Sequence, residues 1–202
     1  YDGSSWTEVA EVNTAGNHRG GAGVVGTAGI LVGGADPAAG PRGLNAVEKW
    51  NGTSWTEVAE IGTAGYGIAC SGTSTAALGS GRYDYPPGVN SGATESWNGS
   101  AWTEVNDLNN ARGQAAGAGI ATTGLVFGGE NPGTAFLDKT ESWNGSSFTE
   151  VGDLNTGRQT LAGAGTQTAA LGFGGVISPG RTNVTELWNG TSWSEQNDLA
   201  VA

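Results

Sequence analysis

A hexapeptide of the form Trp-Asn-Gly-x-x-Trp recurs along the chain and restricts its fold more than any other feature. WNGTSW occupies residues 50–55 and returns unchanged at 188–193, while WNGSAW (97–102) and WNGSSF (143–148) are close copies. A weaker copy, YDGSSW, begins at Tyr1. The first aromatic residues of successive copies are 49, 47, 46 and 45 residues apart. A period of this length indicates a protein built from stacked copies of one small unit.

Other sequence features keep the same phase as the hexapeptide. A Glu-x-Trp sequence leads into four copies, at Glu48, Glu95, Glu141 and Glu186. Before it come a Gly/Ala-rich run, such as AAGAG at 115–119, and a short apolar run ending in glycine, such as LVFGG at 125–129. Helical periodicity is absent, and short runs bounded by glycine and asparagine favour strands. Each unit is therefore predicted to contain four short strands.

The Asn-Gly pair predicts the turn between the third and fourth strands, because both residues tolerate positive φ. A two-residue turn at Asn51 and Gly52, or a four-residue loop from Asn51 to Ser54, would place Trp50 and Trp55 on one face. A single sheet cannot bury both of its faces, whereas stacked sheets can. We therefore expect the hairpin tryptophans to join neighbouring sheets. They are Trp50, Trp55, Trp97, Trp102, Trp143, Trp188 and Trp193.

Four-stranded antiparallel sheets stacked around an axis form a β-propeller. We predict an all-β propeller domain or propeller segment over residues 1–202. Its four complete units lie at about 11–60, 61–107, 108–153 and 154–198, and an extra outer hairpin lies at 1–10. The Gly/Ala run is expected to be innermost, where strands converge. The Thr-Glu or Ser-Glu pair after each hairpin suits the outermost strand, since charges protect an edge from pairing.

The unit also resembles the kelch repeat, with a Gly-Gly doublet ending the second strand, an aromatic residue ending the third and Trp opening the fourth. An arginine before the first strand of two units, Arg112 and Arg158, fits the same pattern. There are departures, because Gly81-Arg82 replaces the doublet in unit two, and Gly16 and Gly65 stand at the arginine position of units one and two.

The Trp-Asn-Gly-x-x-Trp sequence is further similar to kelch-like repeats of marine bacteriophage and bacterial surface proteins. That resemblance implies an exposed module, extracellular or on a virion surface. Kelch-type rings typically have six or seven blades. We therefore expect a part of a longer chain, or a ring completed by further copies, with a four-bladed ring carrying a redundant end as the alternative. The lack of methionine, even at position 1, also favours a processed product or a segment.

Charge and composition argue against several partners and chemistries. The net charge is −11 and the eight Lys and Arg residues are not clustered, which disfavours nucleic acid and anionic membrane surfaces. No apolar stretch approaches the roughly 20 residues of a membrane span, and no secretory signal is visible. The single histidine, His18, and the single cysteine, Cys70, cannot supply a multi-histidine site or an internal disulfide. We expect no enzymatic activity, metal or cofactor.

Two other interpretations of the hairpin residues compete with packing between blades. Paired glutamates such as Glu48 and Glu57 could act as a general acid and base, although a position repeated in each unit is normally architectural. A tryptophan beside a carboxylate could instead stack on a sugar, as in a multivalent lectin.

The loops between the second and third strands differ from unit to unit, at 35–46, 83–93, 130–138 and 176–183. Variable loops on a constant framework are typical of binding surfaces. Antiparallel connectivity places these loops and the unit-linking segments on one rim. We predict that this rim binds a glycan or a protein; a purely structural spacer is the alternative, and a carbohydrate-active enzyme is less favoured. The candidate residues are Arg42, Arg82, Tyr83, Tyr85, Arg112, Arg158 and Arg181.

Overall fold

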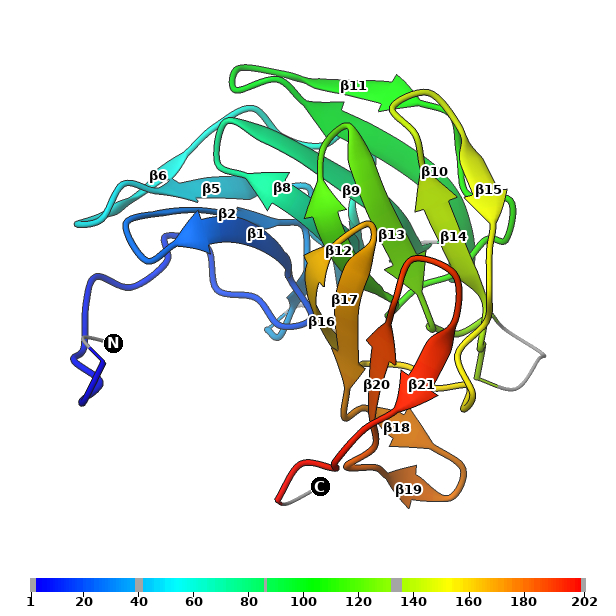
Figure 1. The fold of residues 1–202 in the computed structure, drawn as a ribbon. Helices are drawn as coiled ribbons and strands as arrows, with labels where there is room; N and C mark the ends of the chain where they lie inside the picture. Colours follow the sequence, from blue (N-terminus) through cyan, green and yellow to red (C-terminus); the bar gives the residue numbers. More distant parts are fainter. Residues whose placement is uncertain (1–2, 39–41, 86, 132–135, 201–202) are drawn as a thin grey trace.

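A computed structural model of the chain describes residues 3–38, 42–85, 87–131 and 136–200. Its four main antiparallel sheets are arranged as the blades of a β-propeller, and no described residue is helical (Figure 1). The predicted all-β propeller of four units is confirmed. Within the described part there is accordingly no helix long and apolar enough to cross a membrane.

The blades follow one another along the sequence, and each is named here by its place in the chain. Blade one contains β1 (Gly20–Val25), β2 (Ala28–Val32), β5 (Val47–Trp50) and β6 (Trp55–Glu57). Blade two contains β8 (Ala69–Thr73), β9 (Ala76–Asp84), β10 (Val89–Trp97) and β11 (Trp102–Val105), with β7 (Gly65–Tyr66) also paired to β9. Blade three contains β12 (Ala116–Ile120), β13 (Thr123–Phe127), β14 (Thr140–Trp143) and β15 (Phe148–Glu150). Blade four contains β16 (Ala162–Thr166), β17 (Ala169–Phe173), β20 (Thr185–Trp188) and β21 (Trp193–Glu195). Two short ladders pair β3 (Ala35–Asp36) with β4 (Arg42–Gly43) and β18 (Val176–Ile177) with β19 (Gly180–Arg181).

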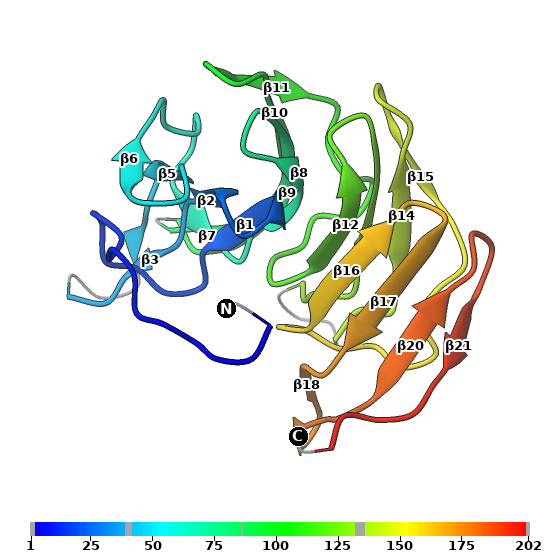
Figure 2. The same ribbon diagram turned by 60° about the vertical axis from the view of Figure 1, so that its left-hand side comes forward.

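The Gly/Ala strand is innermost in each blade, as predicted. The innermost strands form a row in which β1 lies beside β8, β8 beside β12, and β12 beside β16. No packing of comparable extent joins β16 back to β1 among the described residues. The outer strands β6, β11, β15 and β21 lie farthest from this row (Figure 2).

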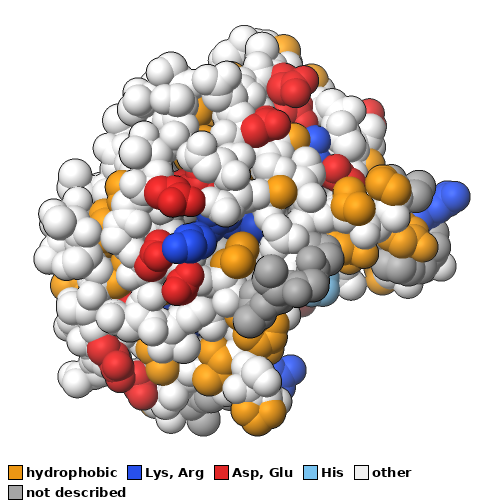
Figure 3. All heavy atoms as spheres, turned by 90° about the vertical axis from the view of Figure 1, so that its right-hand side faces the viewer, with side chains coloured by type: hydrophobic (Ala, Val, Ile, Leu, Met, Phe, Trp, Pro, Cys, Tyr) orange, Lys and Arg blue, Asp and Glu red, His pale blue; other side chains and the backbone are white. Residues whose placement is uncertain are grey.

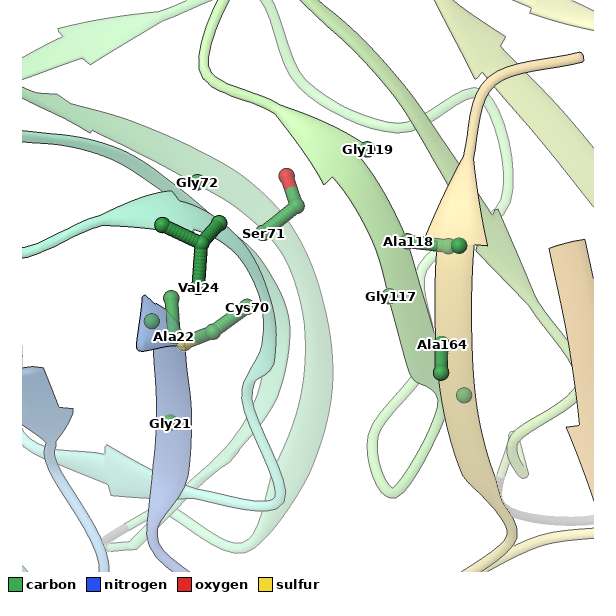
Figure 4. A pocket seen from close by; sticks show the side chains of 13 residues that line it. Gly21, Ala22, Val24, Cys70, Ser71, Gly72, Gly117, Ala118, Gly119 and Ala164 are labelled. Carbon is green, nitrogen blue, oxygen red and sulfur yellow. The ribbon is translucent and has the colours of Figure 1, made fainter. Parts of the chain in front are cut away.

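Small side chains are required where the innermost strands approach one another. A Cβ atom on Gly117 would lie 2.5 Å from the carbonyl oxygen of Cys70, and one on Gly163 would lie 2.7 Å from the ring of Phe127. The four strands line a central cavity of about 400 Å³, into which they present mainly glycine and alanine (Figure 4). The cavity walls therefore offer little side-chain chemistry.

The Asn-Gly hairpins adopt the longer of the two predicted loops. Trp50 pairs with Trp55, and the backbone N–H of Asn51 donates to the carbonyl of Ser54 at 3.2 Å. The side-chain oxygen of Asn51 accepts from the backbone N–H groups of Thr53 and Ser54, both at 2.9 Å. Gly52 takes a positive φ of 96°. The asparagine side chain therefore closes the loop, which explains its recurrence better than a two-residue turn does.

The hydrophobic core lies between blades rather than within them. Trp97 packs with Ile30 and Val32 of blade one, and the equivalent Trp143 and Trp188 pack against blades two and three. These three tryptophans are at most 2% exposed. Each is also paired with the aromatic residue opposite it in the hairpin, as in Trp97–Trp102 with 5.4 Å between ring centroids. The predicted packing role of the hairpin aromatics is thus seen at all three blade junctions.

The leading copy of the repeat lies outside the four blades. Tyr1 and Asp2 are outside the described residues, and residues 3–16 contain no strand. Trp6 corresponds to the second hairpin aromatic, which is buried or partly buried in later copies, and it is 84% exposed. The extra outer hairpin predicted at 1–10 is therefore not seen in its described part, where no third strand is present to pair with it.

The outer strands carry the exposed glutamates, as the edge argument predicts. Glu57, Glu104, Glu150 and Glu195 are all exposed. The space-filling view of one side of the molecule shows acidic side chains spread over the surface, with few basic ones (Figure 3). A like-charged edge of this kind resists sheet-to-sheet pairing with other molecules.

Candidate binding rim

Two of the arginines predicted on the rim are buried in the framework. Arg112 pairs with Glu141, and Arg158 pairs with Glu186 through Nη2 and Oε1 at 3.0 Å. All four side chains have no exposed surface. Burial lowers the pKa of both guanidinium groups, and their glutamate partners oppose this shift. Arg112 and Arg158 join the third strand to the preceding link and are not accessible to a ligand.

The unit-linking segment completes each of these ion pairs. Asn155 donates to Oε2 of Glu186 from its backbone N–H at 2.8 Å and from its side-chain amide at 2.7 Å. Asn109 contacts Glu141 in the same way, at 2.7 and 2.8 Å. The glutamate of the Glu-x-Trp sequence therefore ties one blade to the link that leads into it. This repeated network accounts for the glutamate without any catalytic role.

Blades one and two supply the arginine from other positions in the sequence. Arg19 contacts Glu48 at 2.9 Å, and Arg82 contacts Glu95 at 3.2 Å and Asp84 at 2.8 Å. In these two blades a glycine, Gly16 or Gly65, stands at the position of Arg112 and Arg158. The missing side chain leaves space for the arginine that replaces them. A Cβ on Gly65 would lie 2.8 Å from Cδ of Arg82. Arg82 is only 6% exposed, so it too belongs to the framework.

The carboxylate of Glu48 is held in its charged form. Burial raises its pKa, but hydrogen bonds from Arg19 and from the backbone N–H groups of Asn13 and Thr14 lower it, and the pKa ends below its ordinary value. Glu48 faces Glu57 across the hairpin, as predicted. A fully buried, ion-paired carboxylate is poorly suited to exchange protons with a substrate.

The remaining predicted residues do lie at or near the rim surface. Arg42, Arg181 and Tyr85 are exposed, and Tyr83 is partly exposed. Bridges between the links and the variable loops, such as Gly113 with Glu130, bring both kinds of segment to one edge. The shared rim expected from the strand connectivity is therefore present. Residues 39–41, Pro86 and 132–135 of the variable loops lie outside the described residues.

The inner circle of this rim is built from one residue of each link. His18, Gln114 and Thr160 have φ values of 50°, 57° and 51°, and Gly67 has a φ of 67°. Their backbones form a continuous chain: Gly67 N–H donates to His18, Gln114 N–H to Gly67, and Thr160 N–H to Gln114, at 2.8–2.9 Å. The left-handed conformation thus recurs at the same position of all four links.

A cluster that we call the tyrosine patch stands beside this circle and consists of His18, Tyr66, Tyr83, Gln114 and Glu130. The rings of Tyr66 and Tyr83 have centroids 5.0 Å apart, and His18 lies 5.8 Å from Tyr66. Gln114 Nε2 donates to Glu130 Oε1 at 2.7 Å. Burial, and then the neighbouring Tyr83 and Glu130, raise the pKa of Tyr66, so its hydroxyl remains a neutral donor.

A cavity of about 560 Å³ lies next to the patch and is lined by polar groups of the rim, including His18, Gln114, Gln159 and Arg181. The side-chain oxygen of Gln159 is buried and has no hydrogen-bond partner in the described structure. The volume of this cavity is within the range of roughly 300–1,000 Å³ typical of ligand pockets. A buried acceptor left unpaired at such a site can take a hydrogen from a bound hydroxyl.

Sequence reasoning found the rim but only part of the patch. It identified Tyr83, whereas Tyr66, Gln114 and Glu130 went unnoticed because they come from links and from separate loops. Only Gln114 carries a repeating signal, because it stands at the link position shared with His18, Gly67 and Thr160. No group of three His, Cys, Asp or Glu side chains placed to hold a metal ion occurs among the described residues.

In comparisons with known proteins, neither a family model nor a curated protein matches this chain.

Proposed function

We propose that the chain is a non-enzymatic recognition module that binds a neutral carbohydrate at the tyrosine patch. The observation that carries the proposal is that two tyrosine rings in contact, Tyr66 and Tyr83, lie beside a cavity that holds a buried, unpartnered amide oxygen. Sugar rings stack their apolar faces on aromatic side chains, and their hydroxyl groups need convergent donors and acceptors. Tyr66, Gln114 and Gln159 supply those groups.

The hairpin tryptophans are not the sugar platform in this proposal. Trp97, Trp143 and Trp188 are buried between blades, so the multivalent arrangement suggested by the repeat is unsuitable. Of the predicted rim arginines, Arg82, Arg112 and Arg158 are buried and do not contact the ligand in this proposal. Arg42 and Arg181 lie on separate loops and are exposed. A neutral ligand fits this surface better than an anionic one, because the chain carries a net charge of −11.

We also propose that the repeats are kelch-like and that the module stands on a virion or bacterial surface, as part of a tail fibre or a cell-surface protein. This setting follows the resemblance of the hexapeptides and suits a module that presents variable loops on a constant scaffold. A structural spacer is the second candidate. It is favoured by one observation, that three of the seven predicted rim residues serve the framework.

A glycan array probed with the full chain tests the proposal. We expect binding to neutral saccharides that Tyr66→Ala abolishes, while Tyr66→Phe retains the stacking ring and loses only part of the affinity. Trp6→Ala, which removes an aromatic ring 84% exposed at a distance from the patch in sequence, is the matched control and should bind as the unmodified chain does. Absence of binding to every saccharide, with all variants folded, would favour the spacer.

A further inference from the structure

Each blade of the chain packs through two different faces. One face carries large apolar residues of the second strand, such as Leu125 and Phe127 of blade three. The other carries the aromatic hairpin, such as Trp188 and Trp193 of blade four, which packs onto that first face. This arrangement recurs at all three junctions within the chain. The two ends of the row therefore present one unmatched face of each kind (Figure 2).

The unmatched face of blade four is apolar and exposed. Leu171 is 38% exposed, whereas Leu125, its equivalent in blade three, is 1% exposed. Leu187 on the neighbouring strand is 37% exposed. At the other end of the row, the hairpin face of blade one carries Trp50 and Trp55, which are only partly buried. The residues equivalent to Trp50 in the later blades are at most 2% exposed.

The backbone chain of the inner rim is also open at both ends. It runs from His18 through Gly67 and Gln114 to Thr160, each N–H donating to the preceding carbonyl. In the described structure, the N–H of His18 has no acceptor and the carbonyl of Thr160 has no donor. A donor at one end and an acceptor at the other are the two halves of the bond that repeats between blades.

A side-chain bond shows the same complementarity. The indole N–H of Trp193 in blade four donates to Oγ1 of Thr140 in blade three at 3.0 Å. Thr185 is the equivalent threonine of blade four, and its hydroxyl is buried with no partner in the described part of the chain. Trp55 is the equivalent tryptophan of blade one, and no acceptor for its indole N–H is present in that part either.

We propose that a second copy of this chain packs its first blade onto the last blade of the first copy. The contact repeats the internal junction: Trp55 of the second copy donates to Thr185, its His18 N–H donates to the Thr160 carbonyl, and its tryptophan hairpin covers Leu171 and Leu187. Such a head-to-tail contact is heterologous, so it builds a closed ring or a longer assembly according to the rotation between copies. The proposal is independent of the carbohydrate site.

The mass of the full chain in solution, measured by light scattering over a range of concentrations, tests the contact. We expect twice the 20.2 kDa of one chain, or a higher multiple. Leu187→Lys, which places a charge in the apolar face, should return the mass to that of one chain. Ile120→Lys is the matched control, because Ile120 is 50% exposed but lies at the end of β12 away from both faces.

Mixing two blocked variants distinguishes this contact from any other pairing. Leu31 is partly buried and pairs with Glu48, so it lies on the same face of blade one as Trp50. Leu187→Lys blocks the last face and Leu31→Lys blocks the first, so each variant alone should be monomeric. A mixture of the two variants retains one unblocked first face and one unblocked last face, and should form a one-to-one complex. A single-chain mass at all concentrations for the unmodified protein, or variants that still self-associate, would overturn the proposal. So would a folded mixture that forms no complex.

Discussion

Arg158 and Glu186 lie with Nη2 and Oε1 3.0 Å apart, and neither side chain is exposed to solvent. Asn155 of the preceding link binds the second carboxylate oxygen at 2.7 and 2.8 Å. The same three-part contact recurs around Glu141. This buried carboxylate thus ties the third strand to the link, while Arg158 also donates to the Gly172 carbonyl of the second strand at 3.3 Å, and the stability of the propeller should depend on the network.

Replacing Arg158 with methionine should destabilise the fold strongly. Glu186 would remain as a buried charge without its cation, which typically costs about 3–5 kcal/mol of the free energy of unfolding. Urea denaturation measures the loss. Lys139→Met is the matched control, because the Lys139–Asp153 pair is more than a third exposed and such pairs contribute at most about 1 kcal/mol. Equal losses in the two variants would contradict the account.

In blade two the arginine that pairs with the buried glutamate is Arg82, and a glycine stands at the usual arginine position. A second substitution should therefore restore the stability that loss of Arg82 removes. Arg82→Gly should destabilise the chain because Glu95, only 7% exposed, loses its guanidinium partner. Adding Gly65→Arg restores an arginine at the position that Arg112 and Arg158 occupy in the later blades. The double variant should therefore unfold at a higher urea concentration than Arg82→Gly alone. If the second substitution adds to the loss instead, the two positions are not equivalent.

Acid should weaken the fold through Glu48. Its pKa is below the ordinary value in the folded chain, so its charged form stabilises the fold above that ordinary value, about 4.3 in unfolded chains. This contribution is lost as the pH falls through the folded pKa. Unfolding free energies measured from neutral pH downward should therefore decline less steeply in Glu48→Gln, which begins less stable. Parallel declines would show that other groups carry the acid sensitivity.

The indole bond between blades three and four gives a reciprocal pair of substitutions. Thr140→Val leaves the Trp193 N–H buried without an acceptor, which should cost about 1–3 kcal/mol. In blade one, Val47 occupies the equivalent position, and the Trp102 indole N–H that packs nearby is buried and unpartnered. Val47→Thr should therefore cost less than Thr140→Val or even stabilise the fold. Thermal melts of both variants compare the two effects.

Periodicity revealed the blades because the features that repeat are those that pack. The Asn51 loop, the Trp97 junction and the glycine contacts at Gly117 each belong to a geometry that recurs along the chain. The repeat therefore predicted strand order, the innermost strand and the shared rim. It also led to the expectation of an outer hairpin at 1–10, because the motif was present although the rest of that blade was not.

Burial at the rim was harder to predict, because it depends on which side chains fold back onto one another within a unit. Arg112 and Arg158 were expected at the rim surface, yet they fold back to glutamates 29 and 28 residues later, at Glu141 and Glu186. The arginine and the glutamate both repeat with the period of the unit, but the repeat alone does not show that their side chains form a buried ion pair.

An NMR titration of the full chain with a saccharide bound in the array would locate the carbohydrate site residue by residue. We expect the largest shifts of backbone amide signals at Tyr66, Tyr83, Gln114 and Gln159. The Asn-Gly hairpin loops at the opposite rim should remain unchanged. Shifts centred on those loops, or on the central cavity, would contradict recognition at the tyrosine patch.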